Sequence, residues 1–405
     1  MTKINTAPVR SGSPELRQLL ADIAAGASER EANRIAPHEQ VRQLADAGLG
    51  RLRIPVEEGG AGASLREFFQ VLIDLAAADS NVAHILRVHF WFVEQQVQSA
   101  DAESRARWIA LINEGHIFGN GVSEQNGKEL GITGFTTSLT PDPDQPGAFR
   151  LNGEKFYSTG SLYSTWTQIF ATTPEGHTAL ATVPTDREGV TIEDDWDGFG
   201  QRLTGTGTTR LDNVLVHADE AQDFGDPAGP QPPSYQIPFL QLYLQGVGAG
   251  ILRAVQEDAV ALVRRRKRSF SHAGAPLPAQ DSQVLQVVGE IAADAFAAEA
   301  IVLHAADAIQ AAADSVVDGL PTQEAATAAQ IAAAKAKVAI DAFANATTSK
   351  LFDAGGASAT QSIYNLDRHW RNARTASTHN PTHLKASVVG DFHVNGTNPP
   401  SNGFF

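Results

Sequence analysis

The chain has 405 residues, of which 42% are hydrophobic and 19% charged, and it contains no cysteine. This composition is that of a globular protein long enough to form more than one domain. The formal net charge of −15 argues against nucleic acid or an anionic membrane as the main partner, because both require a basic surface. Small molecules or other proteins fit better.

The absence of cysteine excludes disulfides, thiolate metal sites and a cysteine nucleophile, and it suits the cytosol. The N-terminal segment MTKINTAPVRSGSPEL lacks the apolar stretch of a signal peptide, and no apolar run approaches the roughly 18 residues of a membrane span. We therefore expect a cytoplasmic protein that is not attached to a membrane.

The first region, residues 1–116, has the apolar periodicity of helices. Ser13 and Pro14 form the N-cap and first position of one helix. Ser64 and Glu67 have the spacing of a capping box, and the apolar stripe that follows Ser80 predicts a further helix running through LRVHFWF. We expect an N-terminal helical domain.

The second region, residues 117–224, is rich in threonine, glycine and short alternating segments. PDPDQPG has the composition of a turn, and Glu175 and Gly176 have that of a hairpin turn. This region predicts an antiparallel β domain.

The third region, residues 225–405, begins with a proline-rich linker and continues with alanine-rich helical patterns at 291–313 and 325–346. It predicts a C-terminal four-helix bundle. The stretch GVGAGI at 246–251 is similar to part of a dinucleotide fingerprint, but it follows no predicted strand, so close packing of helices explains its glycines better. The fold class is therefore α+β, with a β domain between two helical domains.

Several stretches resemble acyl-CoA dehydrogenases in the same order along the chain: AGLGRLRIPVEEGGAGAS, GNGVSEQ, FRLNGEKFYSTGS and GFGQRLTGTGTTRLDNVLV. The resemblance covers most of the chain and implies the acyl-CoA dehydrogenase fold. It also implies a homotetramer in which neighbouring C-terminal bundles complete each flavin site.

The catalytic carboxylate of those enzymes is missing. A dehydrogenase needs a carboxylate base to remove the proton next to the thioester. The two places where the resemblance would locate that base read ARTASTHNP and FLQLYLQGVG, and neither contains Asp or Glu. Gln241, the nearest candidate in the second stretch, cannot act as a base. The same absence argues against a nitroalkane-oxidase-like reaction.

The segment DRHWRNARTASTHNP, residues 367–381, instead resembles the flavin-dependent monooxygenases of this superfamily, which include dibenzothiophene and methanesulfinate monooxygenases and a sulfone-utilisation protein. It departs from their pattern only at Asn380, where an Asp is usual. DDWDGFGQR and KFYSTGS support the same branch. The arginines of the segment, Arg368, Arg371 and Arg374, are expected to hold the bundle and subunit contacts.

The resemblance implies an FMNH2-dependent two-component monooxygenase that forms a C4a-(hydro)peroxyflavin with O2 and transfers oxygen to a small organosulfur substrate. Reduced FMN would come from a separate NAD(P)H-dependent flavin reductase, and FAD is the alternative cofactor. Such an intermediate decays to peroxide unless water is excluded and donors hold its terminal oxygens.

Three residues match proposed catalytic positions of the branch: His89, Ser158 and His379. A hydroxyl near flavin N5 and an imidazole near the peroxide are suitable donors. Each also has an ordinary structural interpretation, since a lone histidine on an apolar stripe is more often a core residue and Ser158 could be a simple hairpin hydroxyl. His379 stands near the position that a catalytic carboxylate occupies in dehydrogenases, which favours a functional role.

The resemblance also predicts the residues that bind the flavin. Asn120, Ser123 and Ser158 would hydrogen-bond the ring, Trp196 would lie along the flavin or substrate cavity, and Arg268 would hold the phosphate. Ser358 stands where relatives usually carry an arginine, so one phosphate contact is either lost or supplied elsewhere.

Two other functions remain open at this point: an acyl-CoA dehydrogenase with a displaced base, and a non-catalytic flavin-binding or assembly protein. A metal site is not expected. His379 and His383 have the four-residue spacing of helical ligands, but Pro381 lies between them and no carboxylate accompanies them at a suitable spacing.

Overall fold

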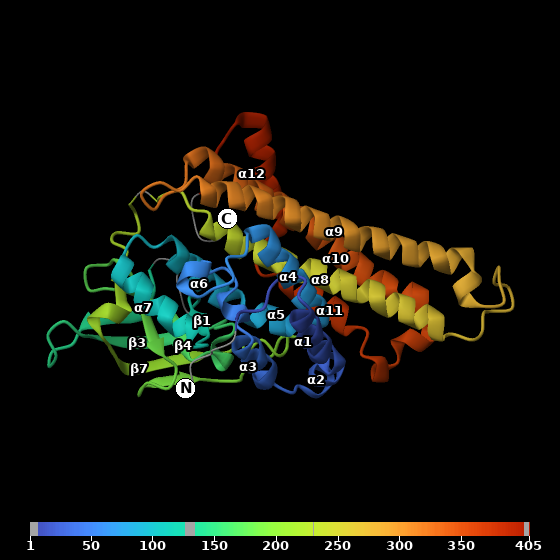
Figure 1. Cartoon of the computed structure of the whole chain (residues 1–405), viewed down its shortest axis with the longest axis horizontal. Coiled ribbons are helices and arrows are strands. Elements are labelled where there is room, and N and C mark those ends of the chain that lie inside the picture. Colours follow the sequence, from blue (N-terminus) through green and yellow to red (C-terminus); the bar gives the residue numbers. More distant parts are fainter. Residues whose placement is uncertain (1–6, 126–133, 230, 401–404) are drawn as a thin grey trace.

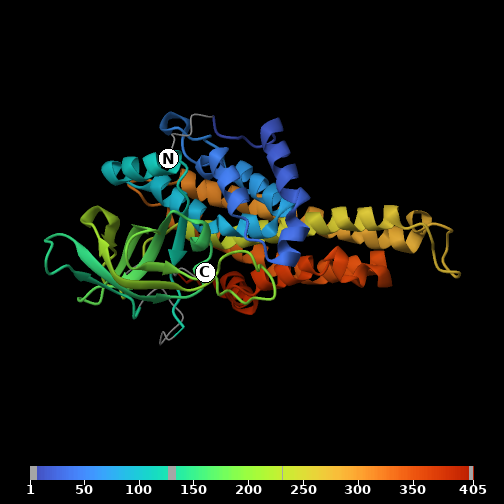
Figure 2. The ribbon, with the colours of Figure 1, turned by 90° about the horizontal axis from the view of Figure 1, so that it is seen from below.

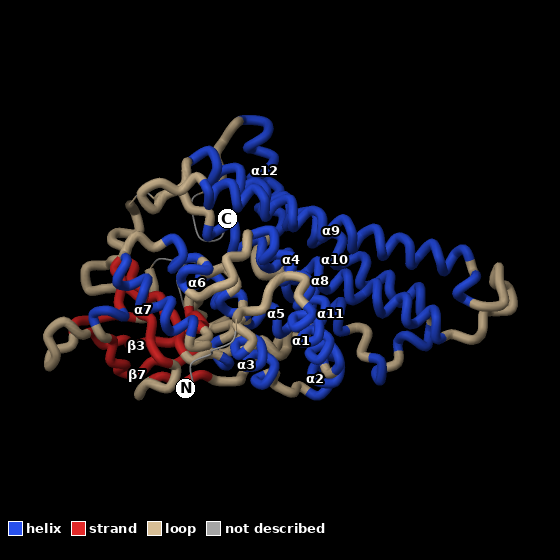
Figure 3. The backbone as a smooth tube through the Cα atoms, viewed as in Figure 1, coloured by secondary structure: helices blue, strands red, loops and turns tan. Residues whose placement is uncertain are grey.

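Helices from both ends of the chain pack together, and a β-sheet lies at one end of them (Figure 1). The computed structural model describes residues 7–125, 134–229, 231–400 and 405. Strands gather on one side of the molecule and the long helices extend away from them (Figure 3). In the described part of the chain, α-helices give way to strands between Asn113 and Phe118, and the next α-helix begins at Gln236.

In the described part of the chain, seven α-helices precede the first strand: α1 Pro14–Ala25, α2 Ala27–Asn33, α3 His38–Asp46, α4 Leu65–Ala78, α5 Ser80–Ile85, α6 Arg87–Gln98 and α7 Ala102–Asn113. The Ser13 hydroxyl accepts a hydrogen bond from the backbone N–H of Leu16 at 3.1 Å, which confirms the first predicted cap. Ser64 and Glu67 form the predicted capping box at the start of α4. The residue spacing in the sequence therefore predicted both helix starts correctly.

The predicted continuous helix after Ser80 is wrong, because the chain forms two helices there, α5 and α6, separated at Leu86. The Asp79 carboxylate caps α5 by accepting from the backbone N–H groups of Asn81 and Val82. Gly160, from the β domain, packs directly on the carbonyl of Ile85. Both helices are buried on nearly all sides, so the apolar stripe continues across a break that only tertiary contacts reveal.

The strands of the described sheet are β1 Phe118–Gly121, β2 Ser138–Pro141, β3 Phe149–Lys155, β4 Trp166–Thr172, β5 Thr178–Pro184, β6 Val190–Ile192, β7 Thr209–Val216 and β8 Ala221–Asp223. Their order is β6-β7-β3-β2-β4-β5-β8, with β1 beside β4. Most pairings are antiparallel, as predicted, but β1 and β2 run parallel to β4. The predicted hairpin turn joins β4 to β5, with Gly176 at a φ of 85°.

The C-terminal region contains three long helices, α8 Gln236–Arg265, α9 Ser282–Asp314 and α10 Gln323–Gly355, followed by α11 Arg368–Ser377 and α12 Thr382–Asn395. The long helices pack along one another, α4 packs against α8 and α9, and α11 packs against α8 and α10. The α8–α9 loop lies at the end of the bundle remote from the sheet (Figures 1 and 2).

The GVGAGI stretch lies inside α8 and is fully buried. A Cβ atom at Gly246 would crowd the Leu72 side chain, and one at Gly250 would clash with Ala76. These glycines therefore allow α8 to approach α4 closely, as predicted. Among the described residues, no helix combines the length and the hydropathy needed to cross a bilayer.

Candidate active site

A cluster of polar side chains lies where α5 and α6 meet α8 and the loop after α11. The Nη1 atom of Arg87 lies 3.2 Å from Nε2 of His379. Nε of Arg87 donates to the carbonyl oxygen of Leu240 in α8 at 3.2 Å, and Nδ1 of His84 lies 3.2 Å from Oε1 of Gln201. Arg87 thus joins α6, α8 and the loop that carries His379.

The tautomer of His379 follows from this contact. A guanidinium can only donate, so Nε2 of His379 accepts and the ring proton lies on Nδ1, which has no protein partner among the described residues. Burial lowers the pKa of His379 well below 6.5, and the positive charge of Arg87 lowers it further. The His379 side chain nevertheless reaches solvent. It is therefore a neutral imidazole with an N–H to donate.

His84 offers the complementary group. The Gln201 amide donates through Nε2 to the hydroxyl of Ser80, which leaves its oxygen to accept from Nδ1 of His84. Burial lowers the pKa of His84 to about 4, with a further contribution from Arg87. Nε2 of His84 has no hydrogen-bond partner among the described residues and is free to accept. The cluster therefore contains one imidazole that donates and one that accepts.

The two stretches that would carry a dehydrogenase base meet in this cluster. Nδ2 of Asn380 donates to Oε1 of Gln241 at 2.7 Å, and both residues are buried. The two stretches therefore meet in a pair of neutral amides, which cannot remove a proton from carbon.

Contacts from α10 anchor the loop that carries His379. Nζ of Lys337 donates to the Asp341 carboxylate at 2.9 Å and to the Ser377 carbonyl at 3.0 Å. The hydroxyl of Thr382 also donates to Asp341. These contacts fix both ends of the loop. Among the described residues, no three His, Cys, Asp or Glu side chains are grouped as metal ligands would be.

Ser158 lies in the loop after β3. Its backbone N–H donates to the Gly207 carbonyl at 3.1 Å, and two residues later Gly160 packs on α5 at Ile85. The Ser158 hydroxyl is fully buried and has no partner among the described residues. A buried hydroxyl without a partner is uncommon, and a bound ligand would satisfy it.

Asn120 and Ser123 lie beside this loop. The Asn120 carbonyl accepts from the Ser161 hydroxyl at 3.0 Å, and the Ser123 carbonyl accepts from the backbone N–H of Phe156 at 2.8 Å. Both side chains are half-buried, and neither has a hydrogen-bond partner in the described ranges. The structure therefore brings Asn120, Ser123 and Ser158 together.

Trp196 joins the two parts of the site. Its indole N–H donates to the Gln201 carbonyl at 2.9 Å. Its ring packs edge to face against Tyr157, with centroids 5.9 Å apart. Trp196 is half-buried and lies next to the Ser158 loop, so its predicted place along a cavity is compatible with its contacts.

His89 is not brought to His379. Its Nε2 donates to the Gly50 carbonyl at 2.9 Å, and its Nδ1 accepts from the backbone N–H of Phe118 at 3.4 Å. The residue is fully buried, and burial lowers the pKa of its imidazole to about 4. Because both ring nitrogens are occupied, this geometry favours the structural interpretation of His89, and His84 takes its place in the cluster.

Arg268 also lies apart from the other candidates. It is exposed in the α8–α9 loop, and α8 alone separates Gln241 from that loop by about 36 Å at 1.5 Å per residue. Near the same end of the bundle, Ser358 lines a cavity together with Arg265 and Arg266. Within one chain, this end cannot reach the Ser158 and His379 region.

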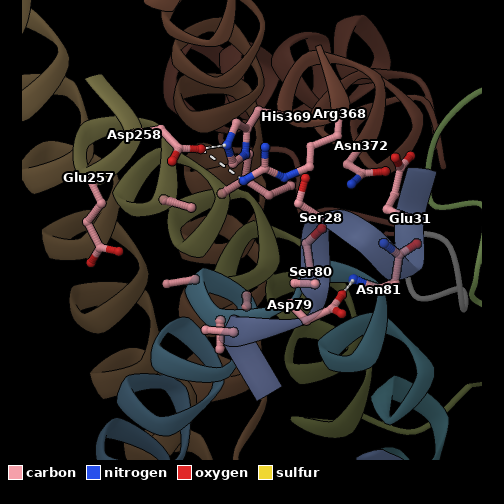
Figure 4. Close-up of a pocket in the computed structure, with 17 residues that line it drawn as sticks. Ser28, Glu31, Asp79, Ser80, Asn81, Glu257, Asp258, Arg368, His369 and Asn372 are labelled. Atoms are coloured by element: carbon pink, nitrogen blue, oxygen red, sulfur yellow. Dashed lines mark hydrogen bonds and ion pairs between the residues drawn. The ribbon is translucent and has the colours of Figure 1, made fainter. Parts of the chain in front are cut away.

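The arginines of α11 mainly hold the helices together, as predicted for two of them. Arg368 pairs with Asp258 of α8 at 2.9 Å, and Arg371 pairs with Glu31 of α2. Figure 4 shows Arg368 and His369 directed at Asp258, in a cavity whose lining does not include Arg87 or His379. Arg374 is exposed, and its side chain makes no hydrogen bond or ion pair within the described ranges.

Comparison with known proteins identifies the family. The acyl-CoA dehydrogenase N-terminal, middle and C-terminal domain models match residues 15–116, 120–214 and 243–383. Dibenzothiophene monooxygenase of Mycolicibacterium goodii is 31% identical over 377 residues, which cover 89% of this chain and 88% of that protein. This chain belongs to the flavin-dependent monooxygenase branch of the acyl-CoA dehydrogenase family.

Solved structures of this monooxygenase branch are similar over nearly the whole chain. TdsC from Paenibacillus sp. A11-2, in a complex with FMN and indole, is 29% identical with a TM-score of 0.88, over 96% of this chain and 98% of that one. Methanesulfinate monooxygenase MsuC from Pseudomonas fluorescens is 26% identical with a TM-score of 0.87, over 97% and 100% of the two chains. These matches confirm the predicted fold and the predicted resemblance to flavin monooxygenases.

Sequence reasoning did not predict that His84 and Arg87 lie in the cluster with His379. Both are polar residues in a mostly apolar stretch, but the break at Leu86 puts them on different helices, so their spacing alone did not predict that they meet. The family resemblance pointed to His89 in the same stretch, and only the contact with His379 distinguishes the two histidines.

Proposed function

We propose that this protein is an FMNH2-dependent two-component monooxygenase that transfers one atom of O2 to a small organosulfur substrate. The observation that supports this most is the neutral His379 imidazole, with a free Nδ1–H, beside the amide pair of Gln241 and Asn380. Such a site can hold an oxygen species by hydrogen bonding, and neither amide can act as the base for dehydrogenation.

The residues present fit a flavin. The buried Ser158 hydroxyl and the side chains of Asn120 and Ser123 have no partners among the described residues, and a polar ring would supply them. FMN is the cofactor bound in TdsC, and we propose it here in preference to FAD. Reduced FMN supplies the two electrons that activate O2, and a separate NAD(P)H-dependent flavin reductase would provide it.

The side chains have distinct roles in this proposal. His379 donates Nδ1–H to the oxygen being transferred, and His84 accepts through Nε2. Ser158 binds near the reacting edge of the ring, where its hydroxyl otherwise lacks a partner. Trp196 covers the side of the site and helps to exclude water, which limits the wasteful release of peroxide.

Arg268 can contribute to flavin binding only if subunits associate. Because α8 holds its loop about 36 Å from Gln241, we propose that Arg268 binds the FMN phosphate of a neighbouring subunit in a homotetramer. Arg265 and Arg266 lie next to Ser358 at the same end, and they are candidates to replace the cation that relatives carry at that position.

The test measures product and hydrogen peroxide together. Wild-type protein is mixed with reduced FMN, O2 and a panel of sulfides, sulfinates and sulfones. We expect an oxygenated product from at least one of them. His379→Ala should keep oxidising FMNH2 but release peroxide instead, with product per flavin lowered on the order of 100-fold, as for loss of one preorganised donor.

His383→Ala is the matched control, since His383 is exposed on α12 and has no place in the proposed mechanism. Unchanged coupling in His379→Ala would remove His379 from the mechanism. Rapid bleaching of the oxidised flavoprotein by butyryl-CoA would instead identify a dehydrogenase. Peroxide alone with every sulfur, amine and indole compound would favour a non-catalytic flavin-binding protein.

A further inference from the structure

Arg87 is a buried cation without a carboxylate partner. Only 7% of the residue is exposed, and no Asp or Glu lies within ion-pair distance of it among the described residues. Two other buried arginines differ, because Arg30 faces Asp79 at 2.9 Å and Arg53 faces Glu94 at 2.6 Å. Burying an unpaired charge is costly, so a cation kept in this state requires an explanation.

The groups around Arg87 do not neutralise it. His84 and His379 are neutral, and the hydroxyl of Tyr243 donates to a backbone carbonyl. Lys337 pairs with Asp341, so that pair adds no net charge. Burial lowers the pKa of Arg87 to about 10, which still leaves the guanidinium charged at neutral pH. The site therefore has an uncompensated positive charge.

One end of the guanidinium remains available. Nε and Nη1 contact Leu240 and His379, whereas Nη2 has no hydrogen-bond partner among the described residues and is not fully enclosed. The adjoining His379 ring is accessible to solvent. Nη2 is therefore the atom of Arg87 left to bind a ligand.

We propose that Arg87 binds the negative group of the substrate, so that the substrate of this enzyme is a small organic anion, with an alkanesulfinate as the organosulfur representative. This inference rests on the proposed monooxygenase function. A guanidinium holds an anion with two oxygens better than it holds a neutral sulfide, because the hydrogen bonds are charge-assisted. Neutral aromatic compounds such as indole offer no such group.

An alkanesulfinate also fits the oxygen-transfer reaction. Its two oxygens carry the charge that Arg87 binds, and its sulfur keeps a lone pair that forms the new S–O bond. The balanced reaction is RSO2⁻ + O2 + FMNH2 → RSO3⁻ + FMN + H2O. Sulfur loses two electrons and FMNH2 loses two electrons and two protons, while the O–O bond breaks and its second oxygen leaves as water.

Binding can be tested without turnover. Methanesulfinate and its neutral analogue dimethyl sulfoxide are titrated calorimetrically into the protein loaded with oxidised FMN. We expect wild type to bind methanesulfinate at least tenfold more tightly than dimethyl sulfoxide. Arg87→Gln should abolish that preference, and Arg87→Lys should retain part of it. Arg374→Gln removes an exposed charge from α11 and should leave both affinities unchanged.

Equal affinity of wild type for the two compounds would overturn the inference, as would an unaltered preference in Arg87→Gln. If Arg87→Gln does not fold, the wild-type and Arg87→Lys preferences decide the question. Turnover assays separate the two proposals. If wild type and Arg87→Gln oxygenated neutral sulfides equally well, the monooxygenase function would be supported and the anion site at Arg87 would be rejected. Peroxide alone from wild type would reject the monooxygenase, whereas the titration would still report on Arg87.

Discussion

Three imidazoles among the described residues are at most 7% exposed and have lowered pKa values: His84, His89 and His369. Burial is the largest cause for each, and each pKa falls to about 4. The folded protein therefore keeps these rings neutral between pH 4 and 6.5, where the rings of the unfolded chain take up protons. The stability that these neutral rings contribute is fully present above pH 6.5 and is lost as the pH falls towards 4.

This linkage predicts an acid-sensitive fold. The free energy of unfolding should fall between pH 7 and pH 4.5, with each histidine contributing up to about 3 kcal/mol at about 1.4 kcal/mol per pKa unit. His89→Gln should lower stability at pH 7 and reduce this pH dependence, because it removes one of the three rings. Urea unfolding at several pH values measures both effects.

His393→Gln is the control, since His393 is exposed on α12 and should leave the pH dependence as in wild type. An identical pH dependence in wild type and His89→Gln would show that His89 titrates as it does in the unfolded chain, in conflict with its burial.

At the scale of elements, the break between α5 and α6 is the feature on which the site depends. It places His84 at the end of one helix and Arg87 at the start of the next, and the loop that carries Ser158 packs against it. Gly160 makes this contact possible. Its φ of 83° is left-handed, and a Cβ atom would clash with the Ile85 carbonyl.

Gly160→Ala should therefore displace the Ser158 loop. With a cost on the order of 1–3 kcal/mol for the strained backbone, we expect FMN affinity to fall roughly tenfold or more, since 1.4 kcal/mol corresponds to a factor of ten. Titration with FMN, followed by quenching of flavin fluorescence, measures this.

Gly176→Ala provides a matched comparison. Gly176 also has a left-handed φ, of 85°, but nothing lies within 4 Å of its added Cβ and it sits in the β4–β5 turn. This variant should lose a little stability and keep the FMN affinity of wild type. Equal losses of affinity in the two variants would mean that backbone strain alone, and not the contact with α5, is responsible.

At the scale of the whole molecule, the loop between α8 and α9, which contains Arg268, lies at the end of the bundle remote from the sheet (Figure 2). If Arg268 serves a neighbouring subunit, two defective variants should complement each other. Arg268→Ala and Ser158→Ala should each bind FMN weakly. Co-expressed mixed assemblies should regain tight sites, because some sites then combine an intact Ser158 with an intact Arg268 from another subunit.

Tagged purification of the mixed assemblies, followed by FMN titration, measures the recovery. Sedimentation of the wild type should give the mass of a tetramer. No recovery in mixed assemblies that are proven to contain both variants would place Arg268 outside the flavin site of its neighbour.

The sequence by itself determined the features that depend on local spacing. These include the caps at Ser13 and Ser64, the order of helical and β regions, the 367–381 segment that resembles monooxygenases, and the lack of Asp or Glu where a dehydrogenase has its base. Hydrogen-bonded turns and side-chain periodicity act over a few residues, so a single sequence contains the information.

Only the tertiary structure decided which polar residues meet. Arg87 and His379 are 292 positions apart, and nothing local predicts their contact. The same holds for the amide pair of Gln241 and Asn380, and for the bonds that occupy both nitrogens of His89. Their chemistry depends on burial and on partners supplied by distant segments, and packing of the complete chain determines both.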